Sequence, residues 1–438
     1  MIMNNKKAVV IGGGLAGVEA AKQLSKRGVK VTLYEMKPRK FSPAHKSEKL
    51  AELVCSNSLK AERVGSAAGL LKAEMSLFGS VCVDAAYKAK VPAGGALAVD
   101  RDVFSDEITK SIESDENITL VREEITEIPS EGIVIIAAGP LVSDSLAQKI
   151  GELCGKDFLS FYDAAAPIVT ADSIDMENAF TQSRYDRGGE DDYINCPLDK
   201  AQYEEFYEAL VNAESADLHS FDKRKDVYEG CMPIEVLASR GKDAMRYGPL
   251  KPVGLTNPKT GHRPWANLQL RKENKDGTMY NLVGFQTNLK FPEQKRVFSM
   301  FPALKNAEFV RYGVMHRNTF LNSPDLLSYD FSLKKDPRIY FAGQISGVEG
   351  YMESASSGIL AGYNAARRIF GEEPILLPKI TMIGALSQYI SDETVKNFQP
   401  MGAAFGIIDP LDERIKDKKQ RYETLAKRSL DYFKTIDL

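Results

Sequence analysis

The sequence predicts a doubly wound α/β domain that is discontinuous along the chain and carries a smaller inserted α+β unit. A strand, a glycine-rich turn and a helix open the chain. The almost wholly apolar run Ile133–Gly139 fits a strand buried on both faces of a parallel sheet. The strand pattern returns at Arg338–Gly343, after a stretch of short strands and Gly/Pro turns. We therefore expect one Rossmann-like domain at residues 1–175 and 305–438, and an inserted unit at residues 176–304.

The first elements alternate between strand and helix. Lys7–Ile11 is predicted to be a strand, and Val18–Lys26 a helix. Gly28 follows that helix directly, in the position where glycine commonly ends one. Val29–Tyr34 is predicted to be the second strand. This order of strand, helix and strand is the opening unit of a doubly wound fold.

The later elements are predicted from helical periodicity. An amphipathic helix near Lys200–Ala213 is the clearest element of the inserted unit. A second helix is expected at Gly358–Phe370, after a glycine-rich connection. Lys, Arg and Glu recur at helical spacing from Asp412 onward, which predicts a surface helix at the C-terminal end.

The turn between the first strand and the first helix predicts a dinucleotide site. It reads Gly12-Gly13-Gly14-Leu15-Ala16-Gly17. Glycines at this spacing allow the backbone to approach a pyrophosphate at a helix N-terminus. Glu35 ends the second strand 18 residues after Gly17, where an acid binds a ribose hydroxyl. The full context favours this interpretation over an ordinary strand–helix turn.

Two further segments favour FAD as the bound dinucleotide. One is the strand that ends at Gly139, because flavoproteins often bring backbone close to the cofactor at such a place. The other runs through Gly343, Gln344 and Tyr351, where many flavoproteins carry an acid in place of Gln344. No second Gly-x-Gly-x-x-Gly follows. We therefore expect resident FAD, with NADPH or NADH reaching the flavin only transiently as reductant.

Two of the five cysteines are candidates for catalysis. Cys231 lies in the turn-rich segment Glu-Gly-Cys-Met-Pro, close to the cations Arg240, Lys242, Arg246 and Lys251. A thiol near cations ionises more readily, and the thiolate is the nucleophile. The alternative for Cys231 is a structural thiol in a turn. For Cys55 the local context alone favours a buried, inert thiol. His316 is equally open between a base, an RNA contact and a structural histidine.

Length and composition exclude several classes of protein. The chain has 438 residues, of which 43% are apolar and 27% charged, as in ordinary globular proteins. No apolar stretch approaches the roughly 18–20 residues that span a bilayer. The first apolar run is too short for a signal peptide, so we expect a cytoplasmic protein. The chain contains no Cys-x-x-Cys and only 4 histidines, so no metal site is expected. No pattern indicates the oligomeric state.

Basic residues concentrate in one part of the chain. Residues 231–330 contain 15 Lys/Arg and 8 Asp/Glu, whereas the whole chain has a net charge of −3. Such a region is either an RNA-binding face or a set of solvated loops. Its candidate phosphate contacts are Arg246, Lys251, Lys290, Lys295, Arg296 and Arg317.

Several long segments resemble one family. They are Val9–Gly17, Leu53–Lys60, Tyr228–Leu255, Leu282–Lys290, Gly313–Pro324 and Ala342–Gly362. Together they are similar to the folate- and FAD-dependent tRNA (uracil-5-)-methyltransferases, which are bacterial flavoproteins of the glucose-inhibited-division-protein type. One departure is Phe291, where the family often has Trp, so aromatic stacking is kept there in a weaker form.

The resemblance implies methylation of the T-loop uridine of tRNA to ribothymidine. It implies 5,10-methylenetetrahydrofolate as carbon donor and reduced FAD as reductant. Cys55 and Cys231 fall on the two functional cysteines of the family, and the sequence leaves open which of them adds to C6 of uracil. Two alternatives are the same chemistry on a uridine of 23S ribosomal RNA, and a non-catalytic RNA-binding flavoprotein. An activated thiol argues against the second alternative, because a binding protein does not need one.

Overall fold

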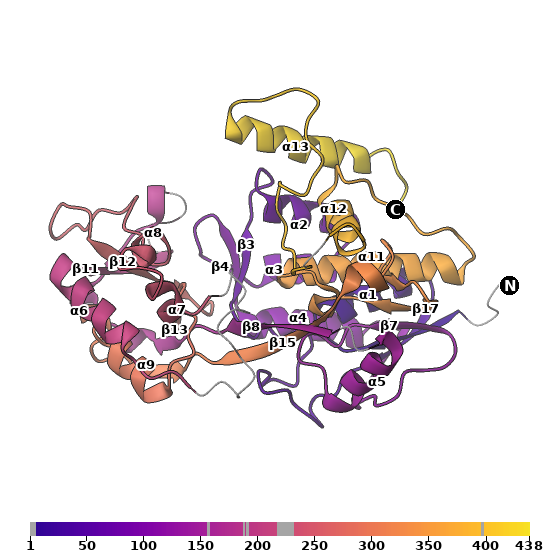
Figure 1. Ribbon diagram of the computed structural model, residues 1–438, viewed down its shortest axis with the longest axis horizontal. Coiled ribbons are helices and arrows are strands. Elements are labelled where there is room, and N and C mark those ends of the chain that lie inside the picture. The colour runs from indigo at the N-terminus through magenta and orange to yellow at the C-terminus, as the bar shows by residue number, and fades with distance from the viewer. Residues whose placement is uncertain (1–5, 156–157, 187–188, 190–191, 217–231, 396–397) are drawn as a thin grey trace.

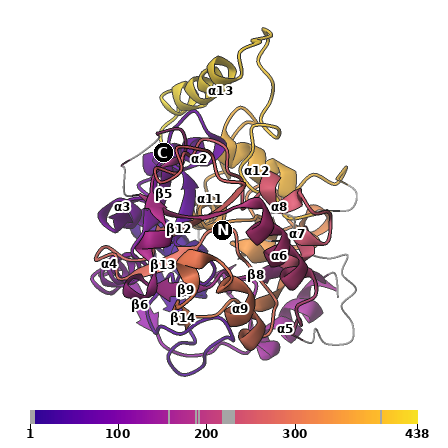
Figure 2. The same cartoon turned by 90° about the vertical axis from the view of Figure 1, so that its left-hand side faces the viewer.

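The computed structural model describes residues 6–155, 158–186, 189, 192–216, 232–395 and 398–438. Figure 1 shows two bodies side by side, each built around a β-sheet. The larger body contains both ends of the described chain. The smaller body faces the viewer in Figure 2. The predicted α/β class with a Rossmann-like sheet is confirmed.

The larger body is built on a six-stranded sheet in the order β16-β17-β7-β1-β2-β6. All neighbours in it are parallel except the edge pair β16–β17. Its strands are β1 (Lys7–Ile11), β2 (Lys30–Tyr34), β6 (Ile118–Val121), β7 (Ile133–Ile136), β16 (Ser332–Leu333) and β17 (Asp336–Phe341). The four residues of β7 are all buried, as the apolar run predicts. The carboxyl ends of the parallel strands therefore meet at one edge, where such sheets bind ligands.

Helices and a small sheet complete the larger body. The helices are α1 (Leu15–Lys26), α2 (Ala67–Leu77), α3 (Val81–Lys88), α4 (Arg101–Glu113), α5 (Asp144–Cys154), α10 (Ser323–Leu326), α11 (Tyr351–Ile369), α12 (Met382–Ile390) and α13 (Lys418–Phe433). The small sheet contains β3 (Ser58–Ala61), β4 (Lys90–Val91) and β5 (Ala96–Val99). Helices α1 and α11 pack closely, since a Cβ at Gly358 would lie 2.1 Å from the Ala16 carbonyl oxygen. This packing fixes the N-termini of both helices near the ligand edge.

Three helices differ from their predicted bounds. Helix α1 begins at Leu15 rather than Val18, because Gly14 is its N-cap. Helix α11 begins at Tyr351 rather than Gly358. The glycine-rich connection ends at Gly350, the N-cap of α11, and Ser356 donates to the Glu353 carbonyl within the helix at 2.8 Å. Helix α13 begins at Lys418, where the Asp417 side chain caps it, rather than near Asp412.

The smaller body is built on an antiparallel sheet in the order β10-β11-β12-β13-β9-β14. Its strands are β9 (Ile168–Thr170), β10 (Phe180–Thr181), β11 (Tyr193–Leu198), β12 (Ala266–Lys272), β13 (Met279–Leu282) and β14 (Phe309–Arg311). Its helices are α6 (Lys200–Val211), α7 (Ile234–Ala238), α8 (Ala244–Tyr247) and α9 (Phe291–Phe298). The division at 176 and 304 stays a prediction, and β9 and β14 lie just outside those bounds.

A long two-stranded ribbon connects the two bodies. It consists of β8 (Phe158–Ala164) and β15 (Met315–Leu321), which pair antiparallel along their whole length. The chain leaves the larger body through β8 and returns through β15 (Figure 1). The ribbon therefore holds the sheet of the smaller body beside the ligand edge of the larger one. Among the described helices, none is both long and apolar enough to cross a bilayer.

Candidate active site

The glycine-rich turn has the geometry of a pyrophosphate cradle. Gly12 has a φ of +105°, and a Cβ there would lie 2.4 Å from the Ala137 carbonyl oxygen. A Cβ at Gly17 would lie 1.8 Å from the Gly12 carbonyl oxygen, so both positions require glycine for the protein's own packing. A Cβ at Gly14 would meet no protein atom within 4 Å. The protein's own packing therefore does not require glycine at position 14, and the space in front of α1 is open there.

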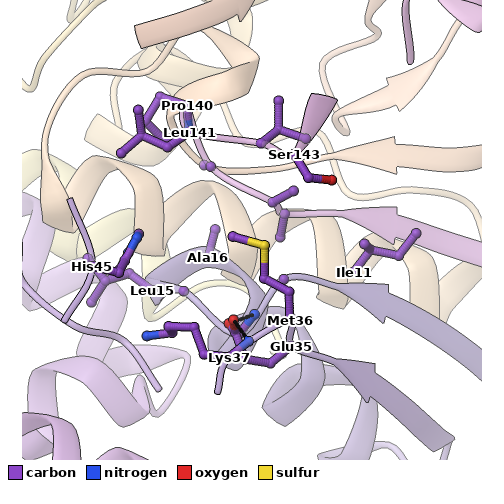
Figure 3. A pocket seen from close by; sticks show the side chains of 18 of the residues that line it. Ile11, Leu15, Ala16, Glu35, Met36, Lys37, His45, Pro140, Leu141 and Ser143 are labelled. Carbon is purple, nitrogen blue, oxygen red and sulfur yellow. Dashed lines mark hydrogen bonds between the residues drawn. The ribbon is translucent and has the colours of Figure 1, made fainter. Parts of the chain in front are cut away.

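Glu35 stands beside this cradle at the end of β2. Its Oε2 accepts from the Gly13 amide at 2.9 Å, and its Oε1 accepts from the Lys37 amide at 3.0 Å. Figure 3 shows Glu35 and Lys37 on one side of the cavity, with Pro140 and Leu141 on the other. The backbone bonds fix the carboxylate, which has further lone pairs for ribose hydroxyls. The residues present therefore fit a dinucleotide.

The cradle opens into a cavity of about 1130 Å³. All but one of the residues that the sequence predicts for cofactor binding line it: Gly12, Gly13, Gly14, Leu15, Ala16, Glu35, Gly139, Gly343, Gln344 and Tyr351. The exception, Gly17, packs against the Gly12 carbonyl behind the lining. The sequence analysis missed His45, which also lines the cavity. Burial, followed by the nearby Lys37, lowers the pKa of the His45 imidazole. A neutral ring therefore faces this cavity near neutral pH.

A second cavity, of about 1110 Å³, adjoins the first. The two share the lining residues Val54, Pro140, Leu141, Gln344, Tyr351 and Ser354. Cys55 lines only the second cavity, together with Lys60, Gln286, Asn318 and Glu353. A group bound in the first cavity can thus contact a group in the second, which Cys55 lines.

Tyr351 and three arginines hold the loop that carries Cys55. The Tyr351 hydroxyl accepts from the Cys55 amide at 2.7 Å and from the Ser56 amide at 3.1 Å. Arg101 donates to the Leu53 carbonyl at 2.7 Å, and Arg311 donates to the Val54 carbonyl. Arg271 donates to the Ser56 hydroxyl at 3.1 Å and to the Asn57 side chain at 2.9 Å. The loop therefore has a fixed backbone, held by three arginines, one of which is ion-paired to Glu273.

The arginines reach this loop from both bodies. Arg101 lies on α4 of the larger body, whereas Arg271 lies on β12 and Arg311 on β14 of the smaller one. No sequence motif marks any of them, and only the fold brings them together. Cys55 is therefore placed at the junction between the two bodies.

Glu353 lines the second cavity and has one unsatisfied carboxylate oxygen. Glu353 is buried in α11, and its Oε1 accepts from Lys60 Nζ at 2.6 Å and from the Ala403 amide at 3.0 Å. Its Oε2 accepts no hydrogen bond from any described residue. A buried acceptor without a partner costs free energy. This atom is therefore a candidate ligand contact that the sequence analysis missed.

The predicted RNA contacts fall into two groups. Arg246 lies in α8 and Lys251 follows it, whereas Lys290, Phe291, Lys295 and Arg296 lie in or next to α9. Helices α8 and α9 lie apart in both views (Figures 1 and 2). Ion pairs already engage some of these side chains, including Lys290 with Glu214 at 2.7 Å and Arg296 with Glu293 at 2.6 Å. Half-exposed Phe291 stacks on Tyr312 at 4.9 Å between ring centroids, next to Arg311.

The side chains of three predicted residues lie outside the described part of the structure. Cys231 lies outside the described residues. His316 and Arg317 lie in β15, and their side chains are outside the described part of the chain. Their catalytic and RNA-binding roles stay predictions. Among the described residues, no group of three or more His, Cys, Asp or Glu has an arrangement that could hold a metal ion.

Comparison with known proteins gives consistent matches. Residues 7–373 match the family described as Glucose inhibited division protein A. The methylenetetrahydrofolate--tRNA-(uracil-5-)-methyltransferase TrmFO of Acetivibrio thermocellus is 58% identical over 425 residues, which are 97% of each chain. The protein of the same name from Enterococcus faecalis is 56% identical over 426 residues, again 97% of each chain. The solved structure of Aquifex aeolicus GidA has a TM-score of 0.70 at 17% identity, covering 99% of this chain and 74% of that one, and it supports the fold.

Proposed function

Because the chain belongs to the TrmFO family of methylenetetrahydrofolate--tRNA-(uracil-5-)-methyltransferases, we propose that it methylates C5 of the T-loop uridine of tRNA. Methylenetetrahydrofolate is the carbon donor and FAD the flavin cofactor. The observation that carries the proposal is the pair of adjoining cavities, with the dinucleotide cradle in one and Cys55 in the other. This arrangement places a nucleophile beside a redox cofactor.

The first cavity is the proposed FAD site. Gly12 to Gly17 would face the pyrophosphate and Glu35 the ribose, while Gly343 and Gln344 line the end that adjoins the second cavity. Reduced FAD supplies the hydride that converts a carbon at the formaldehyde level into a methyl group. The residues shared by the two cavities would hold the cofactor beside the Cys55 loop. We propose NADPH or NADH as the source of the electrons.

The cysteines activate the uracil ring. Carbon C5 is a weak nucleophile until a thiolate adds to C6, which forms an S–C6 bond and moves an electron pair toward C5 and O4. C5 then bonds to the methylene carbon of the folate and loses its proton to a base. The bond from that carbon to the folate nitrogen breaks and releases tetrahydrofolate. The remaining methylene accepts a hydride as the S–C6 bond breaks, which forms the methyl group and releases the thiolate. We propose that Cys55 and Cys231 divide the roles of nucleophile and assistant in proton removal. The fixed backbone of residues 53–57 aims Cys55 into the second cavity.

Glu353 is the proposed contact for the folate. The pterin ring presents an amine and a neighbouring ring N–H along one edge, and a carboxylate accepts from both. Glu353, whose Oε2 is unpartnered, lines the second cavity, where a pterin would lie beside the flavin. Lys60, ion-paired to Oε1, holds the Glu353 side chain in place.

Replacing Glu353 with glutamine should raise the KM for methylenetetrahydrofolate about 10–100-fold, since one charge-assisted hydrogen bond is worth about 1.5–3 kcal/mol. Steady-state methylation assays at varied folate would measure it. The FAD content should not change. Glu62→Gln, which disturbs the exposed pair with Lys90, serves as the control and should leave the KM unchanged. A rise in the KM for tRNA alone would instead place Glu353 against the RNA.

The basic residues near α9 are the proposed RNA face beside the active site. Arg311 joins this face to the Cys55 loop, because the stack of Phe291 on Tyr312 lies next to it in sequence and space. Reversing two exposed charges, in the variant Lys295→Glu with Arg296→Glu, should weaken tRNA binding. It should also reduce the magnitude of the slope of log affinity against log salt by about 0.7–0.9 for each phosphate that the protein no longer neutralises.

Filter binding of tRNA over a range of salt would measure both quantities. Lys416→Glu with Lys419→Glu, on the exposed start of α13, is the matched control and should keep the original slope. Equal losses in both double variants would show that the effect is only that of net charge.

Nucleoside mapping tests the proposed target. In cells that lack this protein, mass spectrometry should show tRNA without 5-methyluridine in the T-loop and ribosomal RNA unchanged. Loss of 5-methyluridine from 23S ribosomal RNA instead would assign the same chemistry to that RNA. Unchanged methylation of both RNAs would overturn the proposal.

A further inference from the structure

A separate groove lies on the smaller body. It is formed by the loop 257–265, the start of α6 and the side chain of Arg246. It shares no lining residue with either cavity of the candidate active site. The chemistry proposed for those two cavities therefore leaves the groove without a role.

The lining of this groove is predominantly basic. Lys200, Arg246, Lys259 and Arg263 line it, together with His262, against the carboxylates of Glu177 and Asp199. Lys200 and Arg263 form no ion pair with any residue that the structure describes. Asp199 is already engaged, because its side chain accepts from the Gln202 amide at 2.9 Å as the cap of α6. The uncompensated charge of the groove is therefore positive and suits an anionic ligand.

An aromatic platform stands in the same groove. The guanidinium of Arg246 lies 3.8 Å from the centroid of the Trp265 ring, and its Nε donates to the Trp265 carbonyl at 2.9 Å. Asp243 accepts from the other end of Arg246 at 2.7 Å, so the guanidinium is fixed against the indole. Trp265 still exposes 37% of its surface, which is unusual for a residue of this size. Stacked aromatic and guanidinium planes surrounded by cations are the features that bind unpaired nucleotides.

Strand β12 runs from Trp265 to the active site, so its length gives the distance between them. Trp265 directly precedes β12, and Lys272 ends it. The Lys272 carbonyl accepts from the Asn57 side chain at 2.9 Å, two residues from Cys55. Seven residues of strand span about 20 Å. A folded RNA can bridge this distance, whereas the single uridine being methylated cannot.

We propose that this groove binds unpaired nucleotides of the tRNA substrate, outside the stem-loop that carries the methylated uridine. The proposal rests on the proposed function. Trp265 supplies the stacking surface, and Lys200, Lys259 and Arg263 contact the flanking phosphates. The groove thereby selects a whole tRNA over an isolated T-arm hairpin.

The fluorescence of Trp265 reports on the groove directly, because it is the only tryptophan among the 438 residues. Titrating the holoenzyme with full-length tRNA should quench this fluorescence and reduce its further quenching by acrylamide. A T-arm hairpin at the same fraction bound should leave it nearly unchanged. Without RNA, protection of Trp265 from acrylamide should not depend on protein concentration. If it rose with concentration, the groove would be a contact between copies of this chain, and the proposal would be overturned.

Two variants test the groove through catalysis. Trp265→Leu, and separately Lys259→Glu with Arg263→Glu, should raise the KM for full-length tRNA about tenfold or more, since stacking of one base is worth about 1–3 kcal/mol. Neither variant should change kcat, FAD content or the KM for the hairpin. Lys259 and Arg263 are exposed, so the double variant should fold even if Trp265→Leu does not. It then tests the groove alone. Lys416→Glu with Lys419→Glu is again the control.

The outcomes separate this inference from the proposed function. If tRNA quenched the Trp265 fluorescence but was not methylated, the groove proposal would stand and the T-loop assignment would be rejected. Methylation with an unchanged KM for tRNA in both groove variants would retain the function and overturn the groove. Equal losses on tRNA and on the hairpin would show that the groove acts through the active site and would likewise overturn the proposal.

Discussion

Replacing Cys55 with alanine is expected to abolish uracil methylation and to leave FAD bound. The S–C6 bond has no substitute, so we expect turnover to fall by about four orders of magnitude or more. FAD binding should persist because Cys55 lines the second cavity and not the first. The Tyr351 hydroxyl accepts from the backbone amide of residue 55, which alanine keeps. The loop should therefore retain its conformation.

The measurement combines methyl transfer with a covalent trap. Incorporation of the labelled one-carbon unit into tRNA measures turnover, and flavin absorbance measures the FAD content. An RNA that contains 5-fluorouridine should form a stable covalent complex with the unmodified protein, because fluorine at C5 does not leave as a proton does. The complex should disappear in the variant of whichever cysteine attacks C6. Cys231→Ala should also abolish turnover, although Cys231 lies outside the described residues.

The buried cysteines supply a matched control. Cys196 lies in β11, and burial raises the pKa of its thiol well above the ordinary value. It cannot act as a thiolate near neutral pH. Cys196→Ala should therefore keep normal turnover in any protein that folds. If Cys55→Ala and Cys231→Ala both kept near-normal turnover as well, covalent catalysis would have to be abandoned.

The sequence predicts those parts of the site that are local in the chain. The glycine turn and Glu35 belong to one strand–helix–strand unit, so their spacing alone defines the cradle. The charge excess of residues 231–330 likewise predicts a basic region, but not that α8 and α9 lie apart. Sequence separation gives no information on which basic residues share a face.

The parts that were missed are formed by distant segments. Arg271 and Arg311 meet the Cys55 loop only because the ribbon β8–β15 brings the smaller body against the larger one. Cys55 on its own resembles an inert core thiol, and its setting becomes visible only with these partners. The start of α11 was misplaced for a related reason, since Ser357 accepts from the Gly343 amide at 2.7 Å across the site. The glycine-rich connection predicts a loop there, whereas this tertiary bond and the packing of α11 against α1 accompany a helix that already begins at Tyr351.

Valine substitutions at Gly14 and Gly17 are expected to fail in different ways. Gly14 has a φ of −75° and a ψ of −175°, which valine adopts without strain, and its Cβ would meet no protein atom. Gly14→Val should therefore fold, but its side chain would occupy the space that the pyrophosphate needs. We expect colourless, folded protein whose affinity for FAD is at least about 100-fold lower. The Cβ of Gly17→Val would lie 1.8 Å from a backbone oxygen, and this clash should unfold a protein of ordinary stability.

Flavin absorbance, thermal unfolding and FAD titration together distinguish the two outcomes. Gly95→Val is the matched control, because a Cβ there also meets no protein atom and Gly95 lines neither cavity. It should retain both fold and flavin. The contrast follows from the geometry of the turn: Gly17 is required by the packing of β1 against α1, and Gly14 only by the ligand. Full FAD occupancy in Gly14→Val would show that the pyrophosphate does not approach the N-terminus of α1, and the cofactor would then have to enter the cavity in another orientation.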